Sequence, residues 1–407
     1  MRRRLLFLFI ALLAGALSAS SGQQASAPSA DAHAEMARKI HSLEDLQSKI
    51  ADRGAGLYIL AIYYARAGNL PKSLGTLKRC IDLDEGFDPT EDPEFAALQS
   101  NPEFQSLTEA ARRHYPTIEN AHVAYPVPKK DLVPEGLAAI PGDGGFYLGS
   151  LYRKKIVKIS KDGAVSDFTI PAQPAWADVC GIKADPASME VWAATCPDIG
   201  MSELLHFGPN GKLIERYSPP GPGPHELNDL VLRADKNIYV TDTLANQVLR
   251  FDRASHAFAP LSFSRPLRQP NGIAISVDGN QLYVADEFGV FQLDLRSNVV
   301  TEIHPEPRNS LAGIDGLYWY RGSLIAVQSI GMRRIIRARL TGAAQPMAKV
   351  EVLENRSKLL SSPTTGAIVG TNFYFISNSQ IENLKDEKIV DERKLAPVLI
   401  SVLPLKE

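Results

Sequence analysis

Six copies of one short pattern carry the side chains of this sequence that could do chemistry. In each copy a small or polar residue is followed by Gly or Asp and then by an aliphatic run, and the copies begin at positions 135, 180, 228, 271, 315 and 365. Four of the leading residues have carboxylate or amide oxygens: Glu135, Asn228, Asn271 and Asp315. Such oxygens suit a hard divalent cation such as Ca²⁺, whereas no cluster of His or Cys in the sequence favours zinc. The pattern therefore predicts a metal site if the fold brings the copies together.

The spacing of the copies indicates how they would meet. Successive copies are 45, 48, 43, 44 and 50 residues apart, and each is followed by short aromatic or β-branched runs bounded by turn residues. A period in this range is typical of a β-propeller with one four-stranded blade per copy. Strands alternate in direction within a blade, so the leading residues should share one mouth of the channel with the ends of the second strands, at Ser150, Asp242, Asp286 and Gln328.

Two of these second-strand residues have a simpler explanation than metal binding. An Asp at the end of a strand often accepts hydrogen bonds from the amides of the next turn, and we expect that role for Asp242 and Asp286. The last apolar run, residues 396–404, is expected to supply the fourth strand of the final blade.

These motifs resemble a known family over about residues 130–400. Glu-Gly at 135–136, Asn-Asp at 228–229, Asn-Gly at 271–272 followed by VDGNQLYVAD, and Asp-Gly at 315–316 are similar to the senescence-marker-protein/gluconolactonase (regucalcin) family. The resemblance implies a six-bladed propeller in which Glu135, Asn271 and Asp315 bind one divalent cation, commonly calcium. It also implies that Asn228 lies beside the metal and contacts substrate or its water, and that Asp315 accepts a proton from the water that attacks a lactone carbonyl.

One position departs from the family pattern. Sugar lactonases of the family commonly have an arginine two positions before the Asn of the Asn-Asp motif, whereas this chain has Glu226 there, preceded by His225. The change alters the electrostatic preference of the mouth, so gluconolactone becomes a doubtful substrate. His225 is interpreted either as a second proton carrier near the metal or as a solvated loop residue after Pro224.

Two functions are compatible with these features. One is a non-enzymatic binding platform, because NIYVTDTLANQVLRFD also resembles NHL-type propeller repeats. The other, which the converging oxygen ligands favour, is a divalent-metal-dependent hydrolase of a lactone or related ester. In that interpretation Asp315 is catalytic, the substrate-binding residues are Asn228, His225 and Glu226, and the metal ligands are Glu135, Asn271, Asp315 and Asn228.

The region before the repeats has a different character. Residues 1–20 have a basic start and an apolar run too short to span a bilayer, which is typical of a signal peptide, and residues 21–32 form a Ser/Ala/Gln/Pro-rich linker. Within residues 33–118, LYILAIYYARAGNLPKSLGTLKRCIDLD resembles a tetratricopeptide helix pair, which needs a packing neighbour on the propeller or on a protein partner. The propeller is expected over residues 122–404. We therefore expect a secreted or periplasmic, mainly β protein: a six-bladed β-propeller preceded by a small α-helical domain.

Charge and cysteine content narrow the partners and the compartment. The formal net charge of −2 does not favour nucleic acid, and no segment after the signal peptide is long and apolar enough to span a membrane. Cys180 and Cys196 flank an apparent hairpin that places them nearly opposite each other. They either form a disulfide, in an oxidising compartment, or pack as two buried thiols. Cys80, in the helical region, is expected to be buried and unpaired.

Overall fold

The structure, a computed structural model, describes residues 30–49, 53–169, 178–197, 201–263, 266–341 and 346–406. These residues form two compact units: one comprises Thr117–Glu306 and Leu311–Glu407, and the other lies within Leu8–Pro116 and includes Pro307–Ser310. The expected signal peptide at 1–20, and most of the expected linker at 21–32, lie outside the described residues. Among the helices that are described, none has the length and apolar character needed to cross a membrane.

The first unit in the chain is helical. It contains α1 (Ala30–Lys49), α2 (Gly54–Arg66), α3 (Leu70–Asp82), the 3-10 helix η1 (Pro93–Leu98) and α4 (Pro102–His114). The two helices α2 and α3 match the predicted helix pair, and the break between them falls at Ala67-Gly68-Asn69. Asn69 caps α3 by accepting a hydrogen bond from Lys72 N at 3.3 Å, with Pro71 in the first turn. Cys80 is a buried free thiol, as expected.

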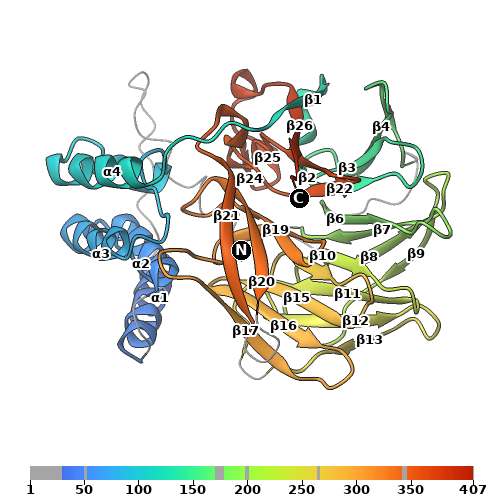
Figure 1. Cartoon of the computed structure of the whole chain (residues 1–407), viewed down its shortest axis with the longest axis horizontal. Helices are drawn as coiled ribbons and strands as arrows, with labels where there is room; N and C mark the ends of the chain where they lie inside the picture. The colour runs from blue at the N-terminus through green and yellow to red at the C-terminus, as the bar shows by residue number, and fades with distance from the viewer. Residues whose placement is uncertain are drawn as a thin grey trace. The chain divides into compact units, whose positions relative to one another are not determined.

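The second unit is a six-bladed β-propeller, which confirms the predicted fold class (Figure 1). Blade 1 contains β2 (Pro134–Ala139), β3 (Phe146–Ser150), β4 (Lys155–Ile159) and β5 (Val165–Asp167). Blade 2 contains β6 (Val179–Ala184), β7 (Val191–Thr195), β8 (Leu204–Phe207) and β9 (Leu213–Tyr217). Blade 3 contains β10 (Leu227–Leu232), β11 (Asn237–Asp242), β12 (Gln247–Asp252) and β13 (Ala257–Pro260).

The remaining three blades follow the same order from the axis outward. Blade 4 contains β14 (Ile273–Ile275), β15 (Gln281–Asp286), β16 (Gly289–Asp294) and β17 (Val300–Pro305). Blade 5 contains β18 (Ile314–Tyr320), β19 (Ser323–Gln328), β20 (Arg334–Thr341) and β21 (Met347–Asn355), and its β21 pairs with β17 in parallel. Blade 6 contains β22 (Gly366–Val369), β23 (Asn372–Ile376), β26 (Val398–Pro404) and β1 (His122–Val127). A small hairpin of β24 (Leu384–Lys385) and β25 (Lys388–Ile389) precedes β26.

Blade 6 corrects one expectation. Residues 398–404 form its third strand, not its fourth. The outermost strand is β1, which comes from the beginning of the unit and pairs antiparallel with β26, for example through Val127 and Val398. Joining the two ends of the propeller in one sheet closes the ring and leaves no open edge between its first and last blades.

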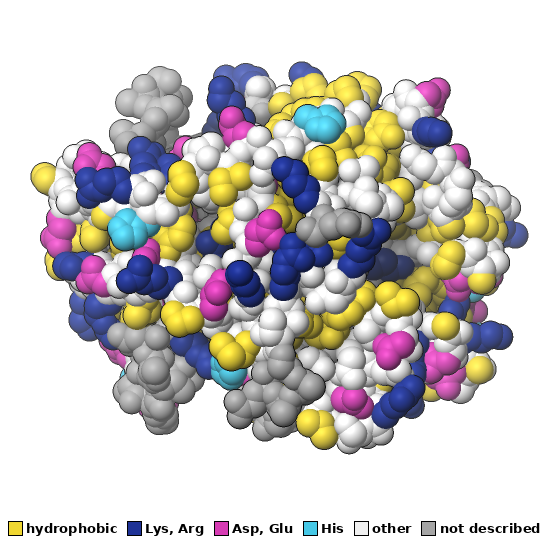
Figure 2. All heavy atoms as spheres, in the orientation of Figure 1, with side chains coloured by type: hydrophobic (Ala, Val, Ile, Leu, Met, Phe, Trp, Pro, Cys, Tyr) yellow, Lys and Arg dark blue, Asp and Glu magenta, His cyan; other side chains and the backbone are white. Residues whose placement is uncertain are grey.

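Apolar side chains fill each interface between neighbouring blades. Between blades 1 and 2, for example, Ile156 packs with Ile182 and Phe207. The interface that closes the ring brings Phe146 of blade 1 against Ile400 of blade 6 and Val127 of β1. The outer surface is charged in both signs: Figure 2 shows acidic and basic side chains intermixed on one face, in keeping with the net charge of −2.

A recurring irregularity marks the leading residues. In blades 1, 2, 3 and 5 the pairing of the first two strands shifts register across the leading motif, for instance between Pro134 and Leu137 and between Ile314 and Leu317. A bulge of this kind re-aims the side chains within it. The leading residue in each of these blades therefore lies at a break in the ladder, where its orientation is released from the simple alternation of the strand.

Candidate metal centre at the propeller axis

Four of the leading residues lie in the innermost strands, and the other two, Asn271 and Thr365, lie just before β14 and β22. These innermost strands contact one another in a ring. Each of β2, β6, β10, β14, β18 and β22 lies against the next, and β22 lies against β2. The glycine after a leading residue makes this approach possible. A Cβ on Gly181 would lie 2.6 Å from Asn228 O of the next blade, and a Cβ on Gly272 would clash with Asp315 O. Glycine is required because the backbone of the next blade occupies the space of a side chain.

The ring places the predicted ligands in a buried setting. Glu135, Asn228, Asn271 and Asp315 are between 1% and 3% exposed. Near the axis, the apolar interface between blades 6 and 1 also includes a hydrogen bond, which Thr364 Oγ1 donates to Glu135 O at 3.3 Å. Carboxylates at this depth are costly unless an opposite charge or hydrogen bonds compensate them.

Asp315 is the electrostatic centre of the group. Burial, followed by the negative charges of Glu135 and Asp229, raises the pKa of Asp315 well above its usual range, and the side chain of Asn271 opposes this rise. Three of the named neighbours thus come from three other blades. The structure brings together Glu135, Asn271 and Asp315, and it adds Asp229, which the sequence interpretation had not included in the site.

Several oxygens in this group have no hydrogen-bond donor among the described residues. They are both carboxylate oxygens of Asp315, Oδ1 of Asn271 and Oδ2 of Asp229. Buried acceptors without donors are rare in proteins, and a cation is the partner that satisfies several of them at once. All are hard oxygen donors, so the residues present fit Ca²⁺ or a similar dication better than a soft metal.

Lys183 of blade 2 compensates the negative charge of Asp229 in blade 3. Lys183 Nζ lies 3.0 Å from Asp229 Oδ1 and 6.0 Å from the centre of the Tyr318 ring. Burial and the charge of Asp229 raise the pKa of Tyr318 well above its usual value, and the Tyr318 hydroxyl accepts a hydrogen bond from Gly366 N at 2.6 Å. With all three carboxylates ionised, as a bound dication would require, Glu135, Asp229 and Asp315 together with this ammonium carry a net charge of −2, which one dication would neutralise.

At the start of blade 3, His225 is held by a carboxylate. His225 Nδ1 lies 2.5 Å from Asp242 Oδ2, and Asp242 is fully buried. Asp242 Oδ1 accepts hydrogen bonds from Glu226 N at 2.9 Å and from Ala245 N at 3.3 Å, which confirms its expected turn-binding role. The other ring nitrogen of His225, Nε2, has no partner among the described residues. A side chain 12% exposed and fixed in this way is not a solvated loop histidine.

The remaining predicted residues lie in blades 3 and 4. Glu226 directly precedes β10 and is 5% exposed, and Asn228 lies in the bulge of that strand. Asp286 accepts hydrogen bonds from Phe288 N at 2.9 Å and Gly289 N at 3.2 Å, as expected.

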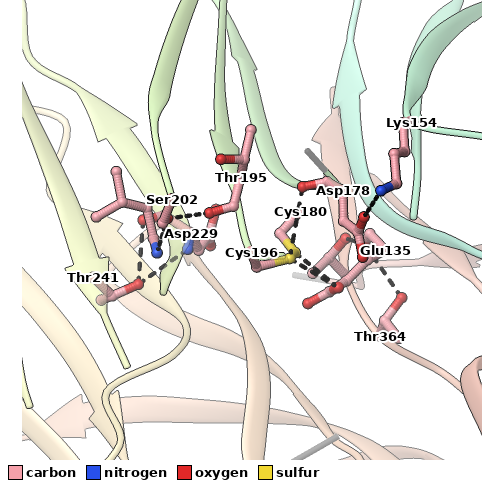
Figure 3. The surroundings of a disulfide bond; sticks show 12 residues. Glu135, Lys154, Asp178, Cys180, Thr195, Cys196, Ser202, Asp229, Thr241 and Thr364 are labelled. Carbon is pink, nitrogen blue, oxygen red and sulfur yellow. Dashed lines mark hydrogen bonds and ion pairs between the residues drawn. A yellow bond between two sulfur atoms is a disulfide. The ribbon is translucent and has the colours of Figure 1, made fainter. Parts of the chain in front are cut away.

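Cys180 and Cys196 form a disulfide with a Cα–Cα distance of 6.0 Å, which decides between the two alternatives (Figure 3). Cys180 is the leading residue of blade 2, and Cys196 directly follows β7. The bridge lies against a predicted metal ligand: Cys180 Sγ is 3.0 Å and Cys196 Sγ is 3.8 Å from Glu135 Oε2. It packs in a small apolar cluster with Leu151 and Ile381.

Comparisons with known proteins show similarity at the level of the fold. No protein-family model matches the sequence, and no curated protein matches it. Among solved structures, a gluconolactonase from Xanthomonas campestris is 15% identical with a TM-score of 0.49, over 72% of this chain and 97% of that chain. An aldose sugar dehydrogenase from Streptomyces coelicolor, in its PQQ-bound form, is also 15% identical with a TM-score of 0.49, over 71% and 99% of the two chains.

A virginiamycin B lyase from Staphylococcus aureus is 16% identical with a TM-score of 0.47, over 63% of this chain and 80% of that chain. A shared propeller does not assign an activity, because function resides in the site that each propeller carries.

Three residues of the centre escaped the sequence interpretation. The sequence does distinguish Asp229, because the other five copies have Gly after the leading residue and this copy has Asp. Lys183 lies three positions after the leading Cys180, where no pattern distinguishes it. Asp242 had been assigned to turn binding alone, and its second oxygen turned out to hold His225.

Proposed function

We propose that this chain is a divalent-metal-dependent hydrolase of a lactone or related ester, with its active site at the mouth of the propeller channel. The observation that carries the proposal is the set of buried oxygens around Asp315 that find no hydrogen-bond donor in the described part of the chain and that come from different blades. An arrangement of this kind destabilises a protein unless a cation compensates it, and a binding scaffold does not need it.

The residues divide into ligands and substrate contacts. The dication would be bound by Glu135 of blade 1, Asn271 of blade 4 and Asp315 of blade 5. Asn228 of blade 3 would lie beside it. A bound dication would act as a Lewis acid on the substrate carbonyl and favour the developing oxyanion. Glu226 is a buried carboxylate directly before β10, at the position where the family commonly has an arginine, and its charge would disfavour anionic substrates.

Two groups can accept the proton of the attacking water. Asp315 is the candidate implied by the family resemblance, but its carboxylate is also a proposed ligand. The His225–Asp242 pair offers a second proton carrier. When Nδ1–H donates to Asp242, Nε2 has a free lone pair, which is the arrangement in which a histidine acts as a general base.

The test is metal analysis of the purified protein followed by a panel of lactones, esters and phosphotriesters, with and without chelator. We expect about one equivalent of tightly bound Ca²⁺ and hydrolysis that chelation abolishes and Ca²⁺ restores. Metal bound at the axis without turnover of any member of the panel would instead support the NHL-like binding platform. A protein that binds no divalent cation would contradict both the site and the activity.

Export and a protein partner are further parts of the proposal. The basic and apolar start of the chain supports secretion or a periplasmic location, and a disulfide is compatible with an oxidising compartment. The tetratricopeptide-like pair of α2 and α3 is the proposed element for contact with a protein partner. Fractionation of cells that express the full chain tests the location, and removal of residues 1–20 should retain the protein in the cytoplasm.

A further inference from the structure

The disulfide shares a carboxylate with the proposed calcium site. Glu135 Oε2 and the Sγ atoms of Cys180 and Cys196 all lie within 4.8 Å of one another. The three residues are between 1% and 2% exposed. As long as the bridge is intact, its sulfurs carry no charge and cannot bind a metal strongly, because the thiolate is the form that binds metals.

Reduction would turn this group into a different kind of metal site. Two thiolates and one carboxylate are a donor set for Zn²⁺, with Zn–S distances of about 2.3 Å and Zn–O distances of about 2.0–2.2 Å. Two thiolates on one tetrahedral zinc are roughly 3.7 Å apart at these bond lengths, so rotation of the two side chains suffices to open the bridge around the ion. The 6.0 Å between the Cα atoms leaves room for this without movement of the strands.

We propose that Cys180, Cys196 and Glu135 form a zinc site when the disulfide is reduced, and that the intact disulfide keeps the mouth selective for hard cations. An external dithiol would supply two electrons and two protons to the bridge, giving two cysteine thiols and the oxidised dithiol. Zn²⁺ would then displace the two thiol protons to solvent and form two Zn–S bonds and one Zn–O bond. Because Glu135 belongs to both sites, zinc at the thiolates withdraws a ligand from the oxygen set.

The surroundings favour such a site over simple hydration of the thiols. Val133, Leu151, Ile381 and Leu384 pack around the two cysteines. Apolar surroundings exclude water and strengthen the attraction between a dication and thiolates. The inference depends on the position of Glu135 and stands whether or not the axial site is catalytic.

The probe is Co²⁺, which binds in the same kind of site as Zn²⁺ and has an absorption band in the near ultraviolet when thiolates bind it. Full-length protein is prepared oxidised or reduced, freed of metal with chelator, and titrated with Co²⁺ and then with Zn²⁺. Thiol counts after unfolding verify the two states: one thiol, from Cys80, in the oxidised protein, and all three cysteines in the reduced protein. We expect one equivalent of Co²⁺ with a thiolate band in reduced protein, displacement by Zn²⁺, and no band in oxidised protein.

Variants separate this site from other thiols. Cys80→Ser should keep the band, whereas Cys196→Ser should lose it and bind Zn²⁺ at least tenfold more weakly than reduced wild type. Glu135→Gln should keep a thiolate band but weaken Zn²⁺ at least tenfold. Equal Zn²⁺ affinity of oxidised and reduced protein, a band that survives the Cys180→Ser, Cys196→Ser double variant, or loss of native circular dichroism on reduction would each overturn the proposal. None of these results bears on Ca²⁺ binding by oxidised protein, so the two metal sites are tested separately.

Discussion

His225 and Asp242 face each other at the start of blade 3, with Nδ1 of the imidazole 2.5 Å from Oδ2 of the carboxylate. One blade further on, the equivalent carboxylate, Asp286, accepts hydrogen bonds from Arg268 N at 3.2 Å and from the amides of the next turn. The same position in the repeat therefore orients a histidine in one blade and stabilises backbone in the next. This difference provides a matched control for the role of His225.

Replacing Asp242 tests whether His225 carries a proton. Asp242→Asn removes the charge that orients the imidazole and should lower kcat by about 10²-fold, with little change in KM. His225→Gln should have a similar effect on kcat. Both variants should bind Ca²⁺ as wild type does in calorimetry, because neither residue is a proposed ligand. If Asp286→Asn lowers kcat as much as Asp242→Asn does, the histidine is not the proton carrier.

Removing two ligand charges tests the calcium site. Ca²⁺ at about 100 times its dissociation constant adds roughly 2.7 kcal/mol to the free energy of unfolding, so chelation should lower the Tm of wild type by roughly 5 °C. The Glu135→Gln, Asp315→Asn double variant should show no calcium-dependent shift in calorimetry. A double variant that binds Ca²⁺ as tightly as wild type would place the metal elsewhere.

The raised pKa of Asp315 predicts how the metal-free protein responds to pH. Between its ordinary pKa and the raised value in the folded state, the folded protein binds more protons than the unfolded chain does. Stability of chelated wild type should therefore fall as the pH rises from about 4, the ordinary pKa of an aspartate, towards neutrality. Chelated Asp315→Asn should lack this part of the decline, and saturating Ca²⁺ should suppress it in wild type. Unfolding by urea over this pH range measures it, and identical slopes for the two proteins would contradict the assignment.

The positive charge of Lys183 should determine whether the metal site prefers a divalent or a trivalent cation. Lys183→Met leaves the carboxylates of Glu135, Asp229 and Asp315 with one more uncompensated negative charge. The variant should bind trivalent Tb³⁺ roughly tenfold more tightly relative to Ca²⁺ than wild type does, because a trivalent ion gains more from the extra charge. Lys183→Arg keeps the positive charge and should retain the wild-type ratio. Competition of Tb³⁺ with Ca²⁺, followed by luminescence, gives both values, and an unchanged ratio in Lys183→Met would show that the lysine does not act on the site.

A glycine substitution tests the close approach of blades 2 and 3. A Cβ on Gly181 would lie 2.6 Å from Asn228 O and 2.8 Å from Asp229 Cα, so Gly181→Ala should destabilise the propeller by about 1–3 kcal/mol. Its control is Gly289→Ala in blade 4, where the nearest atom to a new Cβ is Glu302 Oε1 at 3.8 Å. Chemical denaturation should separate the two variants, and equal stabilities would mean that the blades can move apart at little cost.

Sequence alone predicts the number of blades, the residues that lead each blade and the pair of helices α2 and α3. These features follow from local interactions: hairpin pairing within a blade, turn residues at its corners, and a cap at a helix end. Because each blade needs the same local pattern of strands and turns, the pattern recurs six times in the sequence. This period can be recognised without any knowledge of distances in the structure. The hydrogen bonds of Asp242 and Asp286 to the amides of the next turn were predictable for the same reason, whereas their bonds to Glu226 N and Arg268 N were not, because those amides lie 16 and 18 residues earlier.

Features that depend on closure of the ring are seen only in the three-dimensional structure. Only closure shows that β1 completes blade 6, because that pairing joins opposite ends of the unit. The contact of Lys183 with Asp229 links blades 2 and 3, and the disulfide of blade 2 meets Glu135 of blade 1. Such contacts depend on how far a side chain reaches across an interface between blades, and the repeat period carries no information about that reach. The propeller could therefore be predicted from the sequence, whereas the net charge of the proposed metal site at its axis could not.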